Sequence, residues 1–375
     1  KDKDKDSEIL APMDLEDTAQ VKLLEKAKGT TIRKVGELET MVDYDYQATL
    51  EFMEKYDIEI DWIPGDHSTY ISQLPQLVAS GNPPDTGVLS SGRFLSFYYG
   101  DLCMPINDYL AIDDPYWDKE VLDAFSVNGN YYGVNTGEIE EHFIYYNKTL
   151  FEEEGIEDPY ELYEKGQWSF AKLREIAKKA TIYADDGVTV ETYGIGTYQR
   201  QDFILAQGQD FLKYNEASGE YESNLSSPAV IAGLNYYKDL IADGSYNPGI
   251  HGYSQFPARQ IAMFIENPMN AISNNDLLNN MKDEIGIVPF PPSIVDGKSY
   301  APTNSISNCV PTNSQNPAGG MLWNHYWVRR LADGEKSNNE TWYQRRYKMM
   351  TEAHEEVIVP YRDKTPQITT FFFSI

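Results

Sequence analysis

Strand-like runs alternate with helical patterns between residues 30 and 90, and this alternation constrains the fold more than any other feature of the sequence. Residues 30–35 and 58–63 alternate apolar with polar side chains, as half-buried strands do. A helical pattern separates them, and another follows over 70–80, interrupted by Pro75. A turn and a short third strand come next. This order predicts a parallel sheet with helices on both faces, and so an α/β fold.

Longer helices with well-marked ends occupy the middle of the chain. We expect Ser169 to cap a helix that begins at Phe170, and Ser227 with Pro228 to begin another. Turn residues at 215–219 between the two helices predict a surface hairpin. In the second helix the apolar spacing predicts an inward face made of Ile231, Leu234, Tyr237 and Ile241.

Composition limits the class of protein and its partners. A length of 375 residues suits two domains of ordinary size. The net charge of −28 repels nucleic acid and anionic membrane surfaces, which argues against both as partners. No apolar run is long enough to cross a bilayer. The 28 Tyr residues offer flat apolar faces with hydroxyl groups, which suit neutral polar ligands such as sugars as well as half-buried packing.

Motifs for catalysis and for cofactors are missing from the sequence. There is no nucleophile elbow, zinc-protease motif, phosphate loop or calcium loop, so we expect no cofactor and no metal. The two cysteines, Cys103 and Cys309, lack the spacing of a zinc or redox site. They are either one disulfide or two buried thiols.

Carboxylates are the remaining candidates for chemistry, because a glycosidase needs only two of them across a sugar bond. Glu138, Glu140 and Glu141 lie together after a break in the pattern, and an enzyme that uses Glu138 and Glu140 stays an alternative. A second cluster, Glu152–Glu154, falls at a predicted helix end, where a run of acids predicts a solvated face.

Five segments, in sequence order, resemble one family of proteins. They are YISQLPQLVASGNPPD, IYYNKTLFEEEGIEDP with a Trp after it, SSPAVIAGLNYYKDLIADG, FPARQIAMFIENP and IGIVPFPP. The family is that of the extracellular solute-binding proteins of bacterial ABC importers, which are maltose-binding-protein-like (family 1). The similar segments run from about residue 29 to 333, which is most of the chain.

The resemblance implies a periplasmic-binding-protein-like (type II) clamshell, in which two α/β lobes joined by a hinge close on a ligand in a central cleft. It implies a protein that is not an enzyme and that delivers a carbohydrate, in particular an oligosaccharide, to the permease subunits of an ABC transporter. It also implies an extracellular, lipid-anchored monomer. The charged start KDKDKDSEILAP fits a tether left after an upstream segment was removed.

Lobe bounds follow from the same resemblance. Residues 1–27 would form a tether with a short helix. Residues 28–136 with 304–333 would form the first lobe, and residues 137–303 with 334–375 the second. The Gly, Ser, Asn and Thr content of the crossing stretches is compatible with hinges, although such residues also form ordinary loops.

In the first lobe, the family's cleft residues correspond to two loops. The loop after the first strand and the loop after the third strand contain polar groups that suit either a cleft or solvent: Asp43, Tyr44, Asp45, Ser91 and Arg93. At the crossover, Glu140 falls where the family has a Glu that binds sugar hydroxyls, with Glu138 as the second choice.

In the second lobe, GTYQRQ corresponds to the segment that supplies a stacking aromatic in the family, which indicates Tyr198 and Gln199. The family's Trp platform is replaced by Met269, which has no flat ring to stack on a sugar. Asn267 and Asn270 beside it offer amide groups for hydrogen bonds.

Two Trp residues lie outside these family positions. Trp323 and Trp327 are four apart on one predicted helix, a spacing more typical of a core than of a binding platform.

Other functions stay open on the sequence alone. The same fold could bind a peptide, a polyamine or a metal chelate, and Asp43, Asp45 and Glu140 would suit a polyamine. The protein could also be a sensor or adhesin that presents its ligand to a receptor, or a glycoside hydrolase. The sequence does not name the ligand.

Overall fold

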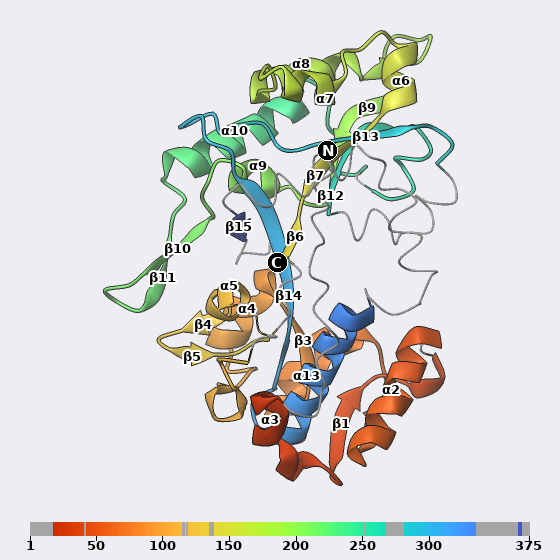
Figure 1. Ribbon diagram of the computed structural model, residues 1–375. Coiled ribbons are helices and arrows are strands. Elements are labelled where there is room, and N and C mark those ends of the chain that lie inside the picture. The colour runs from red at the N-terminus through yellow and green to blue at the C-terminus, as the bar shows by residue number, and fades with distance from the viewer. Residues whose placement is uncertain are drawn as a thin grey trace, which may run out of the picture. The chain divides into compact units, whose positions relative to one another are not determined.

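The structure is a computed structural model that describes residues 18–40, 43–114, 117, 119–134, 139–250, 252–267, 281–334 and 367–369. The chain divides into two compact units (Figure 1). Unit 1 consists of Lys1–Glu138 and Ile306–Asn339, and unit 2 of Ile139–Ser305 and Glu340–Ile375. One strand, β14 (Ala301–Cys309), contributes residues to both units.

Unit 1 contains short strands and six helices among its described residues. The strands are β1 (Thr31–Val35), β2 (Glu59–Ile63), β3 (Gly87–Ser90), β4 (Ser126–Val127) and β5 (Asn130–Tyr131). The α-helices are α1 (Ala19–Leu23), α2 (Asp43–Tyr56), α3 (His67–Ala79), α4 (Ser91–Tyr99), α5 (Lys119–Ala124) and α13 (Pro317–Gly334). Three 3₁₀ turns, η1 (Glu25–Ala27), η2 (Leu38–Thr40) and η3 (Asn107–Tyr109), complete it.

The sheet pairing of unit 1 is mixed. Strands β1 and β2 are parallel, with Thr31 opposite Glu59, as the sequence predicted. Strand β3 pairs with β14 in the antiparallel sense, with Ser90 opposite Ile306. The expectation of a parallel sheet is thus right for β1 with β2 and wrong for β3 with β14, because β14 reaches β3 on the chain's return from unit 2 and not through a crossover helix.

Helix α13 closes the core of unit 1. It packs against α2 and β1, as Figure 1 shows. The side chains buried between these elements include Ile32, Phe52, Tyr56, Leu322 and Trp323. Burial of such large apolar side chains contributes the most free energy to folding, because each removes a large apolar surface from water.

Unit 2 contains a five-stranded sheet in the order β13-β7-β12-β9-β8. The strands of the unit are β6 (Ile139–Glu141), β7 (Phe143–Asn147), β8 (Ile182–Tyr183), β9 (Val190–Gly196), β10 (Leu212–Asn215), β11 (Glu220–Ser223), β12 (Ile261–Glu266), β13 (Ile285–Val288) and β15 (Gln367–Thr369). Its helices are α6 (Lys148–Glu153), α7 (Pro159–Glu164), α8 (Phe170–Lys179), α9 (Asp202–Leu205) and α10 (Pro228–Ala242). Strands β10 and β11 form the predicted hairpin, which extends away from the rest of unit 2 (Figure 1).

Both faces of the unit 2 sheet are apolar. Strand β12 is parallel to β9 and antiparallel to β7, and all its residues are buried. On β7, Ile144 and Tyr146 point to the core under α6, α7, α8 and α10, whereas Phe143 and Tyr145 point to a second core with Phe264. Burial on both faces explains why β7 and β12 are continuous apolar runs in the sequence.

Several helix predictions are confirmed in unit 2. The Ser169 hydroxyl accepts a hydrogen bond from the Lys172 amide at 3.1 Å and so caps α8, and Ser227 caps α10 in the same way. Trp168 is buried and donates its ring N–H to the Pro289 carbonyl at 2.8 Å. Glu152–Glu154 are exposed, as the charge run predicted.

The predicted inward face of α10 is right for Tyr237, which is partly buried and packs against the core, but wrong for its other three residues. Ile231, Leu234 and Ile241 are 46%, 40% and 38% exposed. The buried residues are Ala229, Val230, Gly233, Tyr236 and Leu240. The reason is the close approach of α9: a Cβ on Gly233 would lie 2.6 Å from the Cα of Ile204. The helix therefore turns its small residues, and not its largest apolar stripe, toward α9.

Three local predictions for unit 1 are settled by the structure. Helix α3 is not interrupted, since it runs through Pro75, which is exposed. The residues expected in loops after β1 and β3 begin helices instead, since α2 starts at Asp43 and α4 at Ser91. Cys103 and Cys309 are two buried free thiols and not a disulfide.

We expect a matched pair of substitutions to confirm the orientation of α10. Leu240→Ala should lower the free energy of unfolding by about 2–5 kcal/mol, because it leaves a cavity in the core. Ile231→Ala should change it by less than about 0.5 kcal/mol, because that side chain is 46% exposed. Urea denaturation measures both, and equal losses would contradict the orientation described.

A charged cluster between α8 and α10 gives the stability a pH dependence. Arg174 donates to Asp243 at 2.9 Å and to Asp239 at 2.8 Å, and the Arg174 hydrogen bonds lower the pKa of Asp243 to about 2. The pKa is lower in the folded chain than in the unfolded chain. The stabilisation is therefore complete above about pH 4 and is lost as the pH falls toward 2.

Asp243→Asn should cost about 1 kcal/mol at pH 7, a modest value because solvent screens the partly exposed Arg174. The difference from the unsubstituted chain should shrink below pH 4. Asp185→Asn, at an exposed position on a turn, is the control and should change little at either pH. A loss for Asp243→Asn that is the same at pH 7 and pH 3 would exclude the ion pair as its cause.

Candidate functional site

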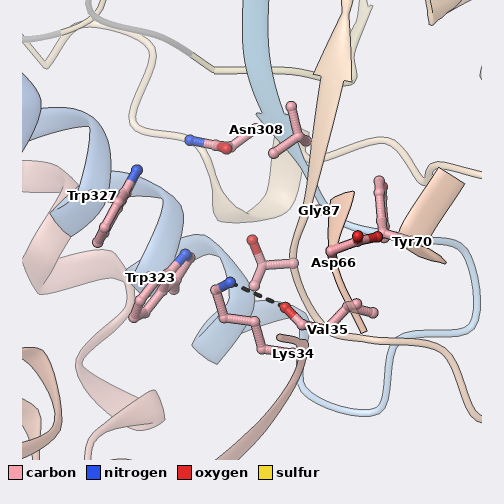
Figure 2. Close-up of a pocket in the computed structure, with 10 residues that line it drawn as sticks. Lys34, Val35, Asp66, Tyr70, Gly87, Asn308, Trp323 and Trp327 are labelled. Atoms are coloured by element: carbon pink, nitrogen blue, oxygen red, sulfur yellow. Dashed lines mark hydrogen bonds between the residues drawn. The ribbon is translucent and has the colours of Figure 1, made fainter. Parts of the chain in front are cut away.

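A cavity of about 240 Å³ lies within unit 1, and Figure 2 shows the side chains around it. Its lining comes from the end of β1, the start of α3, strands β3 and β14, and helix α13. The lining residues are Lys34, Val35, Asp66, Tyr70, Thr86, Gly87, Val88, Asn308, Trp323 and Trp327. Five separate chain segments thus converge on one small space.

Two stacked Trp rings form one wall of the cavity. Trp323 and Trp327, one helical turn apart on α13, have ring centroids 5.2 Å apart and planes 14° apart. Trp323 is buried in the core, whereas Trp327 is only partly buried. Figure 2 shows both rings on the same side of the space, with Asp66 and Tyr70 across from them.

A cation lies against this aromatic wall. The Lys34 ammonium is 5.2 Å from the centroid of Trp323 and 5.7 Å from that of Trp62. It also donates to the Val35 carbonyl at 3.3 Å (Figure 2). Cation–π attraction of this kind holds the lysine in place and keeps its charge at the cavity.

Polar groups complete the lining. Asp66 caps α3 by accepting from the Thr69 amide at 2.8 Å. Thr86 donates its hydroxyl to Asn324, a buried residue of α13. The side-chain amide of Asn308 has no hydrogen bond to another described residue, and Figure 2 shows it at the edge of the same space. An amide carries two donors and an acceptor, so Asn308 is able to bind a ligand hydroxyl in either sense.

The deep wall of the cavity is uncharged. Tyr70 is buried, its hydroxyl lies 3.7 Å from the Cys309 sulfur, and burial raises its pKa well above the ordinary value. Burial also raises the pKa of Cys309 to about 12. Gly87 is required beside them, since a Cβ there would lie 2.0 Å from the Tyr70 hydroxyl oxygen. Aromatic faces, neutral hydroxyls and an amide together suit a neutral polar ligand with an apolar face.

A second cluster of candidate residues lies within unit 2, where the parallel strands β9 and β12 end. It brings together three residues that the sequence predicted: Tyr198, Gln199 and Asn267. Tyr198 is 47% exposed, and its ring lies 6.0 Å from that of Tyr253 at an angle of 31°. Asn267 is buried beside the carboxylate of Glu266, which accepts from the Asn267 backbone N–H at 2.8 Å.

The other predicted site residues are only partly placed. Ser91 is buried in the first turn of α4, and Arg93 is exposed on the same helix. Asp43, Tyr44 and Asp45 begin α2, and Glu140 lies in β6 opposite Asn304, but their side chains lie outside what the structure describes. Glu138, Met269 and Asn270 lie outside the described residues. Their roles stay predictions.

Lys34, Asp66, Asn308 and Trp327 were not predicted as site residues, because they are single residues far apart in the sequence. The nearest signal was the spacing of Trp323 and Trp327. The prediction of a core position is right for Trp323, but the helix also turns the partly buried Trp327 ring to the cavity. A pair of large rings at the same helix face therefore serves both core and cavity wall.

The described residues contain neither a metal-binding cluster nor a membrane-spanning helix. No group of three or more His, Cys, Asp or Glu side chains in them could hold a metal ion. None of their helices is long and apolar enough to cross a membrane.

Comparison with known proteins identifies the family. Residues 47–331 match the family described as bacterial extracellular solute-binding protein. A binding protein of Brucella abortus (strain 2308) is 22% identical over 258 residues, which are 66% of this chain and 59% of that protein. The chain therefore spans about 59% of the length of the curated relatives it matches.

Solved structures agree on the fold. An ABC substrate-binding protein from Listeria monocytogenes, in complex with cycloalternan, is similar with a TM-score of 0.67 and 15% identity, over 92% of this chain and 89% of that one. The galacto-N-biose-/lacto-N-biose I-binding protein of the ABC transporter from Bifidobacterium longum, in complex with lacto-N-biose, has a TM-score of 0.66 and 16% identity, over 91% and 87%. The predicted α/β fold of periplasmic binding proteins is confirmed.

The family match also settles the choice between a binding protein and an enzyme. Solute-binding proteins are transport components that bind and do not catalyse, so the expectation that this chain is not an enzyme is confirmed. With the match over residues 47–331 and the fold of solved solute-binding proteins, the chain belongs to the bacterial extracellular solute-binding protein family.

Proposed function

We propose that this chain is the solute-binding component of an ABC importer and that its ligand is a carbohydrate. The observation that carries the proposal is the stacked pair of Trp323 and Trp327 beside hydrogen-bonding groups in the cavity of unit 1. A sugar ring has an apolar face of C–H groups and a rim of hydroxyls. The aromatic wall suits the face, and Asp66 and Asn308 suit the rim.

Ligands named for two of the proteins of similar fold favour a sugar. The Listeria protein was solved with cycloalternan and the Bifidobacterium protein with lacto-N-biose, both of them oligosaccharides. The cavity of about 240 Å³ in unit 1 is small for such a ligand. We therefore propose that it holds one part of the carbohydrate, with further contacts elsewhere on the chain.

A cationic ligand such as a polyamine is the weaker candidate. The net charge of −28 would attract it, and Trp rings bind cations. The cavity, however, already holds the Lys34 ammonium 5.2 Å from the centroid of Trp323. A second cation on the same face would be repelled at close range, where solvent screens little.

Other parts of the function rest on the resemblance to the family alone. They are hinge closure of two lobes, delivery to the permease subunits, a lipid anchor and the monomeric state. We keep each of them as a proposal. The short polar crossing stretches are compatible with hinges.

A thermal-shift screen tests the ligand class. The recognised carbohydrate should raise the melting temperature, because a ligand that binds only the folded chain adds about 2.7 kcal/mol of stability at a hundred times its Kd. The panel should contain monosaccharides, oligosaccharides of several linkages, polyamines and peptides. Stabilisation by a polyamine or a peptide, with none by any sugar, would overturn the carbohydrate proposal.

Two substitutions in the cavity should weaken binding of the carbohydrate found in that screen. Trp327→Ala should raise the Kd roughly tenfold through loss of ring stacking, and should reduce the change in Trp fluorescence on binding. Asn308→Ala should raise it about three- to tenfold through loss of amide hydrogen bonds. Isothermal titration calorimetry measures both values.

Matched controls separate binding from folding. Tyr99→Ala removes an aromatic side chain that is 61% exposed, and Asn82→Ala removes an exposed amide, both in unit 1 and outside the cavity lining. Both should leave the Kd unchanged. If Asn308→Ala binds as tightly as the unsubstituted chain while its melting temperature is also unchanged, the cavity is not the sugar site.

A further inference from the structure

An acidic pocket of about 690 Å³ lies within unit 2, between helices α6 and α7 and strand β13. It shares no lining residue with the cavity of unit 1. The floor is apolar and includes the buried side chains of Tyr146, Phe151 and Ile156. The charged side chains of its lining are Glu152, Asp158, Glu161, Glu284 and Lys148.

The acids of this pocket exceed their counter-ions. Glu161 lies 2.9 Å from one lysine ammonium and Glu284 lies 3.1 Å from another. Glu152 and Asp158 form no ion pair with any residue that the structure describes. The pocket therefore attracts cationic groups.

Asp158 is held so that one of its oxygens stays open. Its Oδ1 atom accepts from the Tyr146 hydroxyl at 2.7 Å and from the backbone N–H groups of Tyr160 at 2.8 Å and Glu161 at 3.1 Å. Burial and the charge of Asp158 raise the pKa of Tyr146, so this phenol stays a donor. The Oδ2 atom accepts from no residue in the described part of the chain, and a fixed carboxylate oxygen is a strong acceptor for Lys or Arg.

Strand β13, which forms one side of the pocket, is the end strand of its sheet. The Lys148 backbone N–H donates to the Glu284 carbonyl at 2.8 Å, and the register places Ile285 opposite Asn147. Bonded and non-bonded pairs alternate in an antiparallel ladder, so the backbone groups of Ile285 and Ile287 point away from β7. Within the described ranges no strand pairs with that edge, which is a template for another strand.

Side chains alternate across β13 and fix which way an added strand would face. Those of Ile285 and Ile287 pack in the second core, with Phe264. Gly286 faces the pocket, where a Cβ would lie 2.0 Å from the Cζ atom of Tyr146. Every second side chain of a strand added beside β13 would therefore face α6 and α7, which carry three of the four acids.

We propose that the edge of β13 and the acidic pocket form a docking site for an extended partner segment with Lys or Arg at every second position. The partner's main chain hydrogen-bonds to Ile285 and Ile287, and its cations meet Asp158 and Glu152. Main-chain bonds give such strand addition its affinity, and the alternate side chains give it specificity. The proposal goes beyond solute binding and does not depend on the carbohydrate.

Charge complementarity selects this occupant over two others. A second copy of this chain carries the same net charge of −28 and would be repelled. A polyamine would neutralise the acids but would leave the edge of β13 unpaired. Only an extended basic segment uses both features.

Fluorescence anisotropy with labelled peptides tests the docking site on the full chain. The panel has peptides of about eight residues with Lys or Arg at every second position and Val, Thr or Tyr between them. At least one should bind, and its Kd should rise with salt, because the charges are partly exposed. The same peptides with Glu in place of the cations should not bind. Absence of binding by every basic peptide would overturn the proposal.

Backbone methylation of the best peptide tests strand addition itself. The N–H groups of alternate residues point to opposite sides of a strand, so only one alternate set can face β13. Methylating the nitrogens of that set should raise the Kd about tenfold or more, whereas methylating the other set should change it little. Equal effects from the two sets would exclude strand addition.

Substitutions in the chain test the acids. Asp158→Asn and Glu152→Gln should each raise the Kd of the basic peptide about three- to tenfold at low salt. Glu216→Gln, at an exposed position on the β10–β11 hairpin and outside the pocket, is the control and should leave it unchanged. Asp158 also caps α7, so Glu152→Gln decides should Asp158→Asn fold poorly.

The remaining outcomes identify the other occupants. Spermine that binds as tightly as the best peptide and displaces it would assign the acids to small cations and overturn the docking proposal. A dimer of the chain in analytical ultracentrifugation that the peptide dissociates would assign the edge to a second copy. Neither result bears on carbohydrate binding, which the thermal-shift screen tests separately.

Discussion

The buried carboxylate of Asp85 is the interaction on which the cavity of unit 1 depends. It accepts hydrogen bonds from the backbone N–H groups of Arg33 at 2.7 Å and Asn316 at 2.9 Å, and from the Ser314 hydroxyl at 2.6 Å. One side chain therefore joins β1, the segment before β3 and the start of α13. Lys34 follows Arg33 on β1, and the Trp pair lies two turns into α13, so Asp85 sets where the lysine and the rings meet.

The helix is able to come this close only because its first turn is made of small residues. A Cβ on Gly320 would lie 1.8 Å from the Asp85 carbonyl oxygen, and one on Gly319 would lie 2.6 Å from the Ile32 side chain. Asn316 caps the same turn and donates to Thr30 and Thr31. The close approach of the glycines and the Asn316 hydrogen bonds thus fix the aromatic wall to β1 and its flanking segments. A ring that is already fixed loses little entropy on binding.

Sequence patterns predicted the features of the structure that depend on neighbouring residues in the chain. Alternation of apolar and polar residues predicted the strands at 31–35 and 59–63, and capping residues predicted the helix starts after Ser169 and Ser227. The run of charges predicted that the acidic residues at 152–154 are exposed to solvent, and the structure confirms all three. The buried face predicted for α10 was wrong for Ile231, Leu234 and Ile241, because the approach of α9 at Gly233 decides which side is buried. The cavity could not be predicted either. Lys34, Asn308 and Trp327 share no motif and meet only through tertiary contacts such as those of Asp85.

A buried carboxylate surrounded by hydrogen-bond donors lies at both candidate sites, and it indicates a structural role for these acidic residues. Burying a carboxylate is costly unless donors surround it, and both Asp85 and Glu266, which are 1% exposed, have them. Such a group holds its donors in one geometry, because losing it would leave them buried and unsatisfied. Asp85 therefore acts as an internal anchor for β1 and α13, and Glu266 acts as one for the Tyr253 side chain. The burial of these two carboxylates is therefore explained by the hydrogen bonds that they accept, and it does not require a catalytic pair of acids.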